Sequence, residues 1–454
     1  MIQSINPYTG EILKEFNPFD ELQIEAALAK SEAAFRKWKN KDFSERKKLM
    51  KAAAQELREN RDEYAFIITQ EVGKVIKESQ AEIEKCAWVC DYYADFAEEF
   101  LEPKNINLPE GTKAKVFHQP LGAILAVMPW NFPFWQVFRF AAPTLMAGNT
   151  GLLKHASNVP QSALAIQQVF ERAGFPEGVF QTLLIDSKAT NHIIADPRVK
   201  AVTLTGSEKA GAAVAATAGK HIKKSLLELG GSDPFIVLAD ADVPKAAKTA
   251  AKARMINFGQ SCIAAKRFII EESIFDKFID IFSNEIKAMK FGNPENPDSD
   301  YTCMAREDLA LELYEQVEKS VKAGAKILLG GSKPEKGKAL FEPTILTNIP
   351  KEAPAYSEEL FGPVASIFKV KNEAEAIALA NDCEFGLGGS LWTEDLEKAE
   401  KLATQIETGA VFINALTASN PHLPFGGIKK SGYGRELSQE GILEFVNKKT
   451  VFLG

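Results

Sequence analysis

The sequence predicts an α/β protein made of two α/β units in series. Short apolar runs typical of buried strands alternate with helix-patterned stretches, which indicates parallel sheets covered on both faces. The chain has 454 residues, and at roughly 150 residues per domain it has room for about two to four folding units. Hydrophobic residues make up 45% and charged residues 25%, which excludes a wholly disordered chain.

The first part of the chain is predicted to form an outer helical layer. From about residue 21 to residue 100, apolar side chains recur at spacings of three and four between charged ones, as in Leu49-Ala53-Leu57. A first α/β series follows, and its segments are strands at 123–128, 150–154 and 199–204 and helices at 134–146 and 161–172.

A second α/β series begins after residue 229. Its predicted segments are strands at 234–238, 267–270, 325–329 and 364–368 and a long helix at 243–258. Turn-rich loops are expected at 292–300 and 330–338. Residues 446–453 are predicted to form a strand that pairs outside its own domain.

Charge and hydropathy limit the possible partners. The net charge is −7, and the 54 basic and 61 acidic residues are interspersed, so no nucleic-acid partner is expected. The N-terminus lacks a basic flank followed by an apolar stretch, and the longest apolar runs are far shorter than the roughly 20 residues of a membrane span. We expect a soluble, cytoplasmic protein without a membrane partner.

The cysteines are few and odd in number, which argues against a disulfide framework and fits a reducing compartment. They are Cys86, Cys90, Cys262, Cys303 and Cys383. Cys86 and Cys90 are four apart in a helical pattern and are interpreted as packing residues rather than metal ligands, because no matching pair lies nearby. The five histidines lack ligand spacing, so no metal site is expected.

Three segments carry candidate chemistry. Cys262 follows small residues after a long helical pattern, so its thiol either faces a cleft or packs in the core. Glu228 ends an apolar run before two glycines and is either a general base of raised pKa or a solvated strand end. Asn131 follows a strand, at the edge where α/β proteins bind ligands, and its amide can donate to an oxyanion.

A weaker signal marks a nucleotide site. The segment Thr205-Gly206-Ser207 follows a strand and opens a helical stretch, and a glycine turn at a helix N-terminus suits a pyrophosphate. The full G-x-G-x-x-G spacing is absent.

These segments together resemble the aldehyde dehydrogenase superfamily, especially its short bacterial NAD(P)-dependent succinate-semialdehyde dehydrogenases. Six segments occur in the family's order, at 129–133, 205–207, 228–231, 259–262, 359–363 and 424–427. The resemblance implies an aldehyde dehydrogenase-like fold in three parts. These are a Rossmann-type NAD(P)-binding domain (1–100 and 119–229), an α/β catalytic domain (230–428) and a small β oligomerisation element (101–118 and 429–454).

The resemblance also implies the catalytic roles. Cys262 matches the nucleophile, Glu228 the general base and Asn131 the oxyanion donor. The thiolate would add to the aldehyde carbonyl, and the thiohemiacetal would lose a hydride to the nicotinamide to leave a thioester on Cys262. Water activated by Glu228 would then release a carboxylic acid.

Cofactor contacts are carried over in the same way. Lys154 matches the lysine at the cofactor ribose, while Glu359 and Phe361 match residues at the nicotinamide ribose and ring. Many NAD-preferring relatives have an acidic residue three positions after the lysine, where this chain has Ser157. A hydroxyl accommodates the 2′-phosphate that a carboxylate would repel, so we expect NADP to be preferred and NAD also to be used. The complete expected set is Trp130, Lys154, Ser157, Gly206, Ser207, Leu229, Glu359 and Phe361.

Substrate choice rests on Arg139 and Ser419. Arg139 lies eight residues after Asn131 among aromatic residues, and it is either a helix-surface ion-pair partner or an anion ligand. Both positions match residues that hold the carboxylate in succinate-semialdehyde dehydrogenases, so oxidation of succinate semialdehyde to succinate is expected. The predicted walls of the pocket are Phe132, Trp135 and Phe425, although aromatic residues at such spacing are more often plain core.

Some features leave alternatives open. Some relatives have a second, redox-switching cysteine two residues after the nucleophile and an arginine six residues before it; this chain has Ala264 and Ile256. We therefore expect no such switch, and a weaker or less length-selective grip on the substrate. Another semialdehyde, such as glutarate semialdehyde, is the nearest alternative. Transfer to coenzyme A and a non-catalytic role are disfavoured by Glu228 and by the intact catalytic set. The resemblance implies a homodimer or homotetramer formed through the C-terminal strand, whose open edge a lone chain would leave unpaired.

Overall fold

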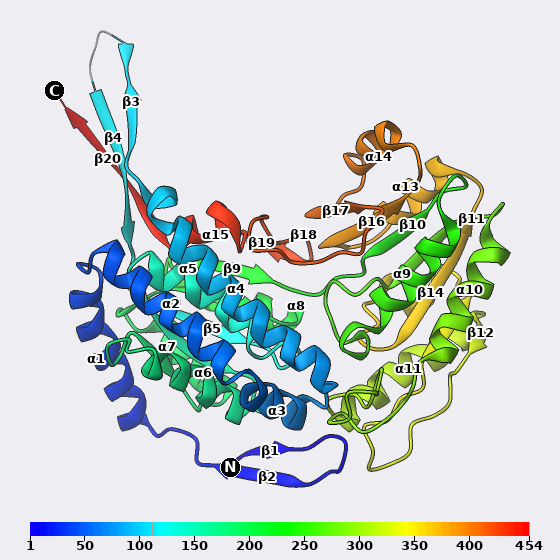
Figure 1. Cartoon of the computed structure of the whole chain (residues 1–454), viewed down its shortest axis with the longest axis horizontal. Coiled ribbons are helices and arrows are strands. Elements are labelled where there is room, and N and C mark those ends of the chain that lie inside the picture. The colour runs from blue at the N-terminus through cyan, green and yellow to red at the C-terminus, as the bar shows by residue number, and fades with distance from the viewer. Residues whose placement is uncertain (110–112, 454) are drawn as a thin grey trace.

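A computed structural model describes residues 1–109 and 113–453. Two α/β lobes face each other across the molecule, and a narrow three-stranded sheet projects from the N-terminal lobe (Figure 1). The two α/β units predicted from the sequence are therefore present, one sheet in each lobe.

Helices cover the N-terminal lobe, as predicted for residues 21–100. They are α1 (Glu21–Trp38), α2 (Phe43–Glu59), α3 (Arg61–Val72) and α4 (Ile76–Leu101). Asp20 caps α1 through its side chain, which accepts from the backbone N–H of Gln23. The side-chain oxygen of Gln23 in turn accepts from the backbone N–H of Asp20, which completes a capping box. The antiparallel strands β1 (Ile2–Ile5) and β2 (Ile12–Phe16) precede this layer.

The sheet of the first lobe has six strands. In spatial order they are β19 (Gly432–Tyr433), β9 (Lys224–Glu228), β8 (Val199–Thr205), β5 (Ala123–Met128), β6 (Thr150–His155) and β7 (Phe180–Thr182). All neighbours are parallel except β19, which runs antiparallel to β9. The connecting helices are α5 (Trp135–Met146), α6 (Pro160–Arg172), α7 (Ser187–Ala195) and α8 (Glu208–Lys220).

The second lobe has a seven-stranded sheet. In spatial order its strands are β12 (Lys326–Leu329), β13 (Thr344–Thr347), β14 (Val364–Val370), β11 (Arg267–Glu271), β10 (Pro234–Val237), β16 (Gly388–Trp392) and β17 (Ala410–Ile413). Only the β12–β13 pair is antiparallel. Its helices are α9 (Val243–Met255), α10 (Phe275–Ala288), α11 (Glu307–Ala323), α12 (Pro354–Ser357), α13 (Glu373–Asn381) and α14 (Leu396–Ala403).

The C-terminal segment returns to the first lobe. After the short pair β15 (Phe385–Gly386) and β18 (Ile428–Lys429) it forms α15 (Ser438–Leu443) and then β20 (Val446–Leu453). Strand β20 pairs along its whole length with β4 (Lys113–Pro120), which also pairs with β3 (Lys104–Asn107). The strand predicted at 446–453 is thus present, and these three strands form the projecting sheet.

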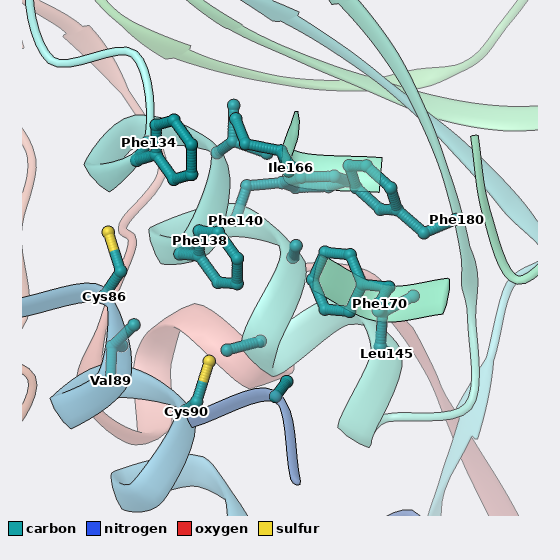
Figure 2. Packing of buried hydrophobic residues seen from close by; sticks show 14 of the residues in the cluster. Cys86, Val89, Cys90, Phe134, Phe138, Phe140, Leu145, Ile166, Phe170 and Phe180 are labelled. Carbon is teal, nitrogen blue, oxygen red and sulfur yellow. The ribbon is translucent and has the colours of Figure 1, made fainter. Parts of the chain in front are cut away.

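The main core lies between the helical layer and the first sheet. Stacked aromatic rings from α5 and α6, such as Phe138 and Phe170 with centroids 5.2 Å apart, fill it (Figure 2). Cys86 and Cys90 of α4 are fully buried among these apolar side chains, as expected for packing residues. No helix within residues 1–109 and 113–453 is long and apolar enough to cross a membrane.

Candidate active site

The loop that carries Cys262 begins where α9 ends. The helix predicted to reach residue 258 stops at Met255, and Asn257 and Phe258 adopt left-handed φ angles of 48° and 54°. Gly259 also has a positive φ of 74°, and a Cβ there would lie 2.3 Å from the carbonyl oxygen of Gly362. Only glycine fits this close approach, and the resulting sharp turn presents Cys262 at the lobe surface instead of extending the helix.

Cys262 opens into a cavity of about 220 Å³. The cavity lies between α4 and α5 of the first lobe and the loops around Cys262 and Ser419. Every residue predicted to bind the substrate lines it, namely Phe132, Trp135, Arg139, Ser419 and Phe425. The structure therefore brings this set to the cysteine, although its members lie up to hundreds of positions apart in the sequence.

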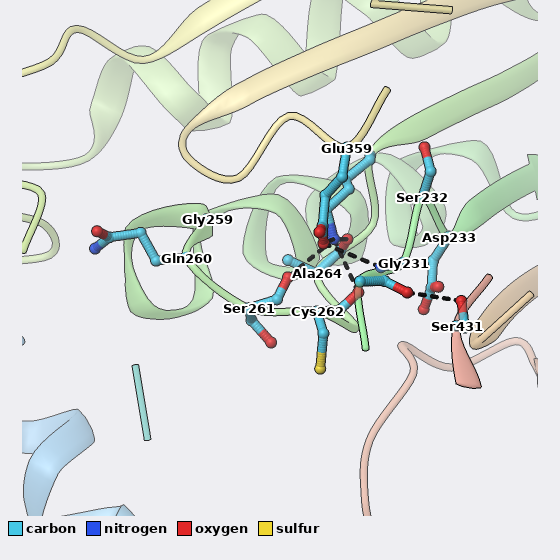
Figure 3. Close-up of polar contacts among 12 residues, drawn as sticks. Gly231, Ser232, Asp233, Gly259, Gln260, Ser261, Cys262, Ala264, Glu359 and Ser431 are labelled. Carbon is cyan, nitrogen blue, oxygen red and sulfur yellow. Dashed lines mark hydrogen bonds and ion pairs between the residues drawn. The ribbon is translucent and has the colours of Figure 1, made fainter. Parts of the chain in front are cut away.

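The Cys262 thiol is separated from the polar contacts behind it. Figure 3 shows its sulfur pointing away from the hydrogen bonds around Gly231 and Glu359. Burial raises the pKa of Cys262 to about 12, and the positive charges of Arg139 and Lys266 oppose this shift. Neighbouring cations therefore favour the thiolate, which is the nucleophilic form.

Asn131 is 3% exposed and lies beside the cysteine loop. Its Nδ2 donates to the carbonyl oxygen of Gln260 at 3.0 Å, and its Oδ1 accepts from Nε2 of Gln136 at 3.1 Å. Asn257 holds the same loop by donating to the backbone oxygen of Asn131 at 2.8 Å. The amide is fixed close to Cys262 with a second N–H still available to donate, although Asn131 is not among the cavity-lining residues.

Glu228 ends β9 and is 2% exposed, so it is not a solvated strand end. Neither of its carboxyl oxygens has a hydrogen-bond partner among the described residues. Burial raises the pKa of Glu228 well above its ordinary value, and the nearby carboxylate of Glu436 raises it further. At Gly426 a Cβ would lie 2.7 Å from Glu228 Oε1, so the glycine provides room for the carboxyl group.

Arg139 is 2% exposed on α5, so it is not a surface ion-pair residue. Its Nε contacts Oε2 of Glu436, and its guanidinium carbon lies 4.6 Å from the centroid of the Phe425 ring. Its Nη2 makes a long contact of 3.4 Å with Thr205 Oγ1. Arg139 thus already has an anionic partner inside the protein. Glu436 follows β19, and no pattern in the sequence marks it as a site residue.

A second cation, which no pattern in the sequence indicates, also lines the cavity. Lys85 projects from α4, and its Nζ donates to the hydroxyl of Ser419 at 2.7 Å. The ammonium lies 4.4 Å from the centroid of the Trp135 ring. Ala264 and Ile256 also line the cavity, so the two positions at which this chain departs from some relatives face the same space.

The predicted cofactor residues gather at the carboxyl ends of the first sheet's strands. Lys154 is half-buried near the end of β6, burial lowers its pKa, and Ser157 is exposed three residues later. Gly206 and Ser207 follow β8 at the N-terminus of α8, where the Ser207 hydroxyl accepts from the N–H of Ala210 at 3.4 Å. A lysine, a free hydroxyl and a helix N-terminus at one sheet edge form a donor set that fits the phosphates of a dinucleotide.

The remaining predicted cofactor residues lie where the two lobes meet, except Leu229, which packs in the core of the first lobe. Glu359 accepts from the N–H of Gly231 at 3.1 Å and forms an ion pair with Lys266, whose Nζ lies 3.1 Å from Glu359 Oε1. The rings of Trp130 and Phe361 meet edge to face with centroids 5.9 Å apart. Leu229 is buried against Gly211 of α8, where an added Cβ would lie 2.6 Å from the leucine side chain.

Comparison with known proteins assigns this arrangement to a family. The sequence profile described as "Aldehyde dehydrogenase family" matches residues 1–451. The chain belongs to the aldehyde dehydrogenase family.

Named relatives of this aldehyde dehydrogenase match it over its full length. A probable succinate-semialdehyde dehydrogenase (NADP+) of Synechocystis sp. is 51% identical and covers 100% of this chain and 99% of its own. A succinate-semialdehyde dehydrogenase (NADP+) of Mycobacterium avium is 50% identical, with coverages of 100% and 97%. The crystal structure of succinic semialdehyde dehydrogenase from Streptococcus pyogenes with NADP+ is 40% identical, with a TM-score of 0.97 and full coverage of both chains. The predicted family and α/β fold are confirmed.

Proposed function

We propose that this aldehyde dehydrogenase oxidises succinate semialdehyde to succinate with NADP as the oxidant. The decisive observation is one cavity that contains the Cys262 thiol and two cationic side chains, Arg139 and Lys85. A thiol beside cations suits an aldehyde that carries a carboxylate at its other end. The names of the relatives at about half identity point to the same substrate and cofactor.

The residues of the site support a two-stage reaction. The Cys262 thiolate adds to the aldehyde carbon to give a thiohemiacetal, while the free N–H of Asn131 and the backbone N–H of Cys262 stabilise the oxyanion. NADP, when bound, supplies the hydride acceptor that makes this step an oxidation. The substrate carbon is then a thioester on Cys262. Glu228 accepts a proton from water, the water oxygen attacks the thioester, and the acid and the free thiol are released.

The cofactor preference rests on Ser157. The residue is exposed three positions after Lys154 and carries no charge, so this position adds no carboxylate that would repel a 2′-phosphate. The negative charge of Asp186 also acts on Lys154, where it opposes the lowering of the lysine pKa by burial. We propose that NADP is preferred and that NAD is also accepted.

The test compares initial rates with succinate semialdehyde and with butanal, an uncharged aldehyde of equal length, using NADP or NAD. The wild type is expected to prefer the acid and NADP, and Arg139→Ala to lose mainly the preference for the acid. A thermal melt of the variant shows whether loss of the contact with Glu436 has unfolded it. Equal wild-type kcat/KM for the two aldehydes would overturn the proposed substrate, and a large preference for NAD would overturn the argument from Ser157.

A second candidate substrate is a longer semialdehyde such as glutarate semialdehyde. The observation in its favour is that Ile256 lines the cavity without adding a charge, so the cavity does not fix the chain length by a second arginine. A chain-length series of ω-aldehyde acids separates the two. Highest kcat/KM with four carbons supports succinate semialdehyde, and highest kcat/KM with five supports the alternative.

We also propose that the enzyme is a homo-oligomer, a dimer or a tetramer, joined through the projecting sheet. In that sheet β20 lies at the edge, and seven of its eight residues are exposed. The strand ends in three exposed apolar residues, Val451, Phe452 and Leu453, and an open strand edge with such an end is favourably covered by another chain.

A further inference from the structure

Lys85 occupies the cavity without a carboxylate partner of its own. Its half-buried side chain comes from α4, and no ion pair to it exists within residues 1–109 and 113–453. Two carboxylates of α4, Glu78 and Glu82, also line the cavity, but both have other partners. Glu82 pairs with Lys74 and accepts the backbone N–H groups of Phe134 and Trp135 at 2.9 and 3.0 Å, and Glu78 accepts the backbone N–H of Asn257 at 3.1 Å. A cation that has lost water and gained no anion is costly, so Lys85 is available to an incoming anion.

Arg139 is the more occupied of the two cations. Its Nε is held by Glu436, whose carboxylate is buried with it. An incoming carboxylate must therefore share Arg139 with an internal anion, whereas at Lys85 it meets an unneutralised charge. Attraction to Lys85 is consequently less offset by a competing carboxylate.

The hydrogen-bond donors of Lys85 and Ser419 also favour the binding of an anion here. The ammonium of Lys85 has three donors and uses one on Ser419. Because the Ser419 oxygen accepts that bond, its own hydrogen is free to point into the cavity. A carboxylate placed beside them can accept from both groups, through charge-assisted bonds of the strong kind.

We propose that Lys85, together with Ser419, is a second carboxylate anchor of this enzyme and a determinant of its specificity for anionic aldehydes. The inference rests on the proposed function, since it assigns the residue that recognises the charged end of that substrate. The ammonium of Lys85 lies 4.4 Å from the centroid of the Trp135 ring. This cation–π interaction stabilises the charged lysine when no anion is bound.

The ionisation of Lys85 provides a specific readout. Burial lowers the pKa of Lys85 to about 8, and the positive charge of Arg139 on α5 contributes to the lowering. The facing groups on α4, Cys86 and Glu82, act in the opposite direction. As the pH rises through about 8, the empty site loses this charge, so the KM for an anionic aldehyde should rise while that for a neutral aldehyde does not follow.

The experiment measures kcat and KM for succinate semialdehyde and butanal in Lys85→Met, Lys85→Arg and the control Lys77→Met. Methionine keeps an unbranched stem against Trp135, and Lys77 is an exposed lysine on the same helix, outside the cavity. Lys85→Met should raise the ratio of the two KM values, acid over neutral, by roughly 10- to 100-fold. Lys77→Met should leave the ratio at the wild-type value.

The pH profile separates anchoring from a structural role. The wild-type KM ratio should rise by about tenfold per pH unit above pH 8, and Lys85→Arg, which stays charged, should flatten that rise. An unchanged ratio in Lys85→Met, or a pH rise that persists in Lys85→Arg, would overturn the inference. These outcomes are distinct from failure of the proposed function, which a wild type with no preference for the acid would show.

Discussion

Single side chains at this site act through burial and unpaired charge. Glu228 shows this most clearly. Its carboxyl group is buried with no hydrogen-bond partner among the described residues, so it costs stability and does not serve to hold the fold together. Its raised pKa keeps it protonated to a higher pH than a surface glutamate, since burial penalises the charged form. Once deprotonated in that setting, it is a stronger base toward water than an exposed carboxylate.

Replacing Glu228 by glutamine should separate the two stages of the reaction. Acylation of Cys262 does not need this base, so one equivalent of NADPH per active site should still form rapidly. Thioester hydrolysis loses its base, and steady-state kcat should fall by roughly 10²- to 10⁴-fold. Stopped-flow absorbance of NADPH measures both the burst and the steady rate.

The pH dependence checks the same assignment. In the wild type, kcat should rise with pH as Glu228 loses its proton, and the glutamine variant should lack that rise. Glu352→Gln, which changes an exposed carboxylate, is the matched control. A variant that loses the burst together with the turnover would show that Glu228 acts before the thioester forms.

At the scale of elements, contacts between segments that are distant in the sequence determine where some helices end, and a sequence pattern does not predict such contacts. The helix predicted at 243–258 stops at Met255, although the apolar spacing continues to Phe258. The turn is set by Gly259 lying against Gly362, which is a contact between distant segments that local periodicity does not record. By contrast, β5 was predictable because its run of six apolar residues is a local signal.

The sequence indicates those site residues that lie in short local motifs and misses those that only folding brings to the cavity. Cys262, Glu228 and Asn131 lie in short segments whose order resembles that of a known family, and so could be proposed from the sequence. Lys85 is 334 residues from Ser419 in the sequence. The pattern around it predicts only an amphipathic helix of the outer layer. Its position in the cavity follows from the packing of α4 against α5, which only the folded chain reveals.

His155 ties the end of β6 to the segment that carries Asn131, and its charge state should control local stability. Its Nε2 lies 2.9 Å from the carbonyl oxygen of Pro133, and its Nδ1 accepts from the N–H of Ala156 at 2.9 Å. These contacts require the neutral ring with its proton on Nε2. Burial lowers the pKa of His155 to about 4.

A folded-state pKa below the unfolded value of about 6.5 means that the native state binds fewer protons. The contribution of His155 is therefore complete above pH 6.5 and lost as the pH falls toward 4, by at most about 3 kcal/mol. Urea unfolding between pH 4.5 and 7.5 should show this loss in the wild type and a smaller one in His155→Gln. The exposed His192→Gln is the control, and an equal pH slope in the wild type and His155→Gln would contradict the assignment.

At the scale of the whole molecule, the cavity is lined by residues of both lobes, and the projecting three-stranded sheet is separate from them. The cavity draws on both lobes, because α4 and α5 face the Cys262 loop and the segment before β18. No residue of β3, β4 or β20 lines the cavity, and the sheet that they form projects away from the N-terminal lobe (Figure 1). Strand β20 leaves the apolar side chains of Val451, Phe452 and Leu453 exposed at its end. Exposed apolar residues on an open strand edge favour association with another chain.

A charge placed on this strand should therefore dissociate the assembly. Phe452 is 61% exposed, and Phe452→Glu should reduce the mass measured by light scattering to that of one chain, because a buried unpaired carboxylate at the interface is costly. Leu396→Glu changes an equally exposed apolar residue (60%) on α14 and should leave the mass unchanged. Because β20 contributes no residue to the cavity lining, the dissociated variant should still form the thioester in a burst assay. A wild type that already has the mass of one chain, or an oligomer that survives Phe452→Glu, would show that the edge of β20 does not hold subunits together.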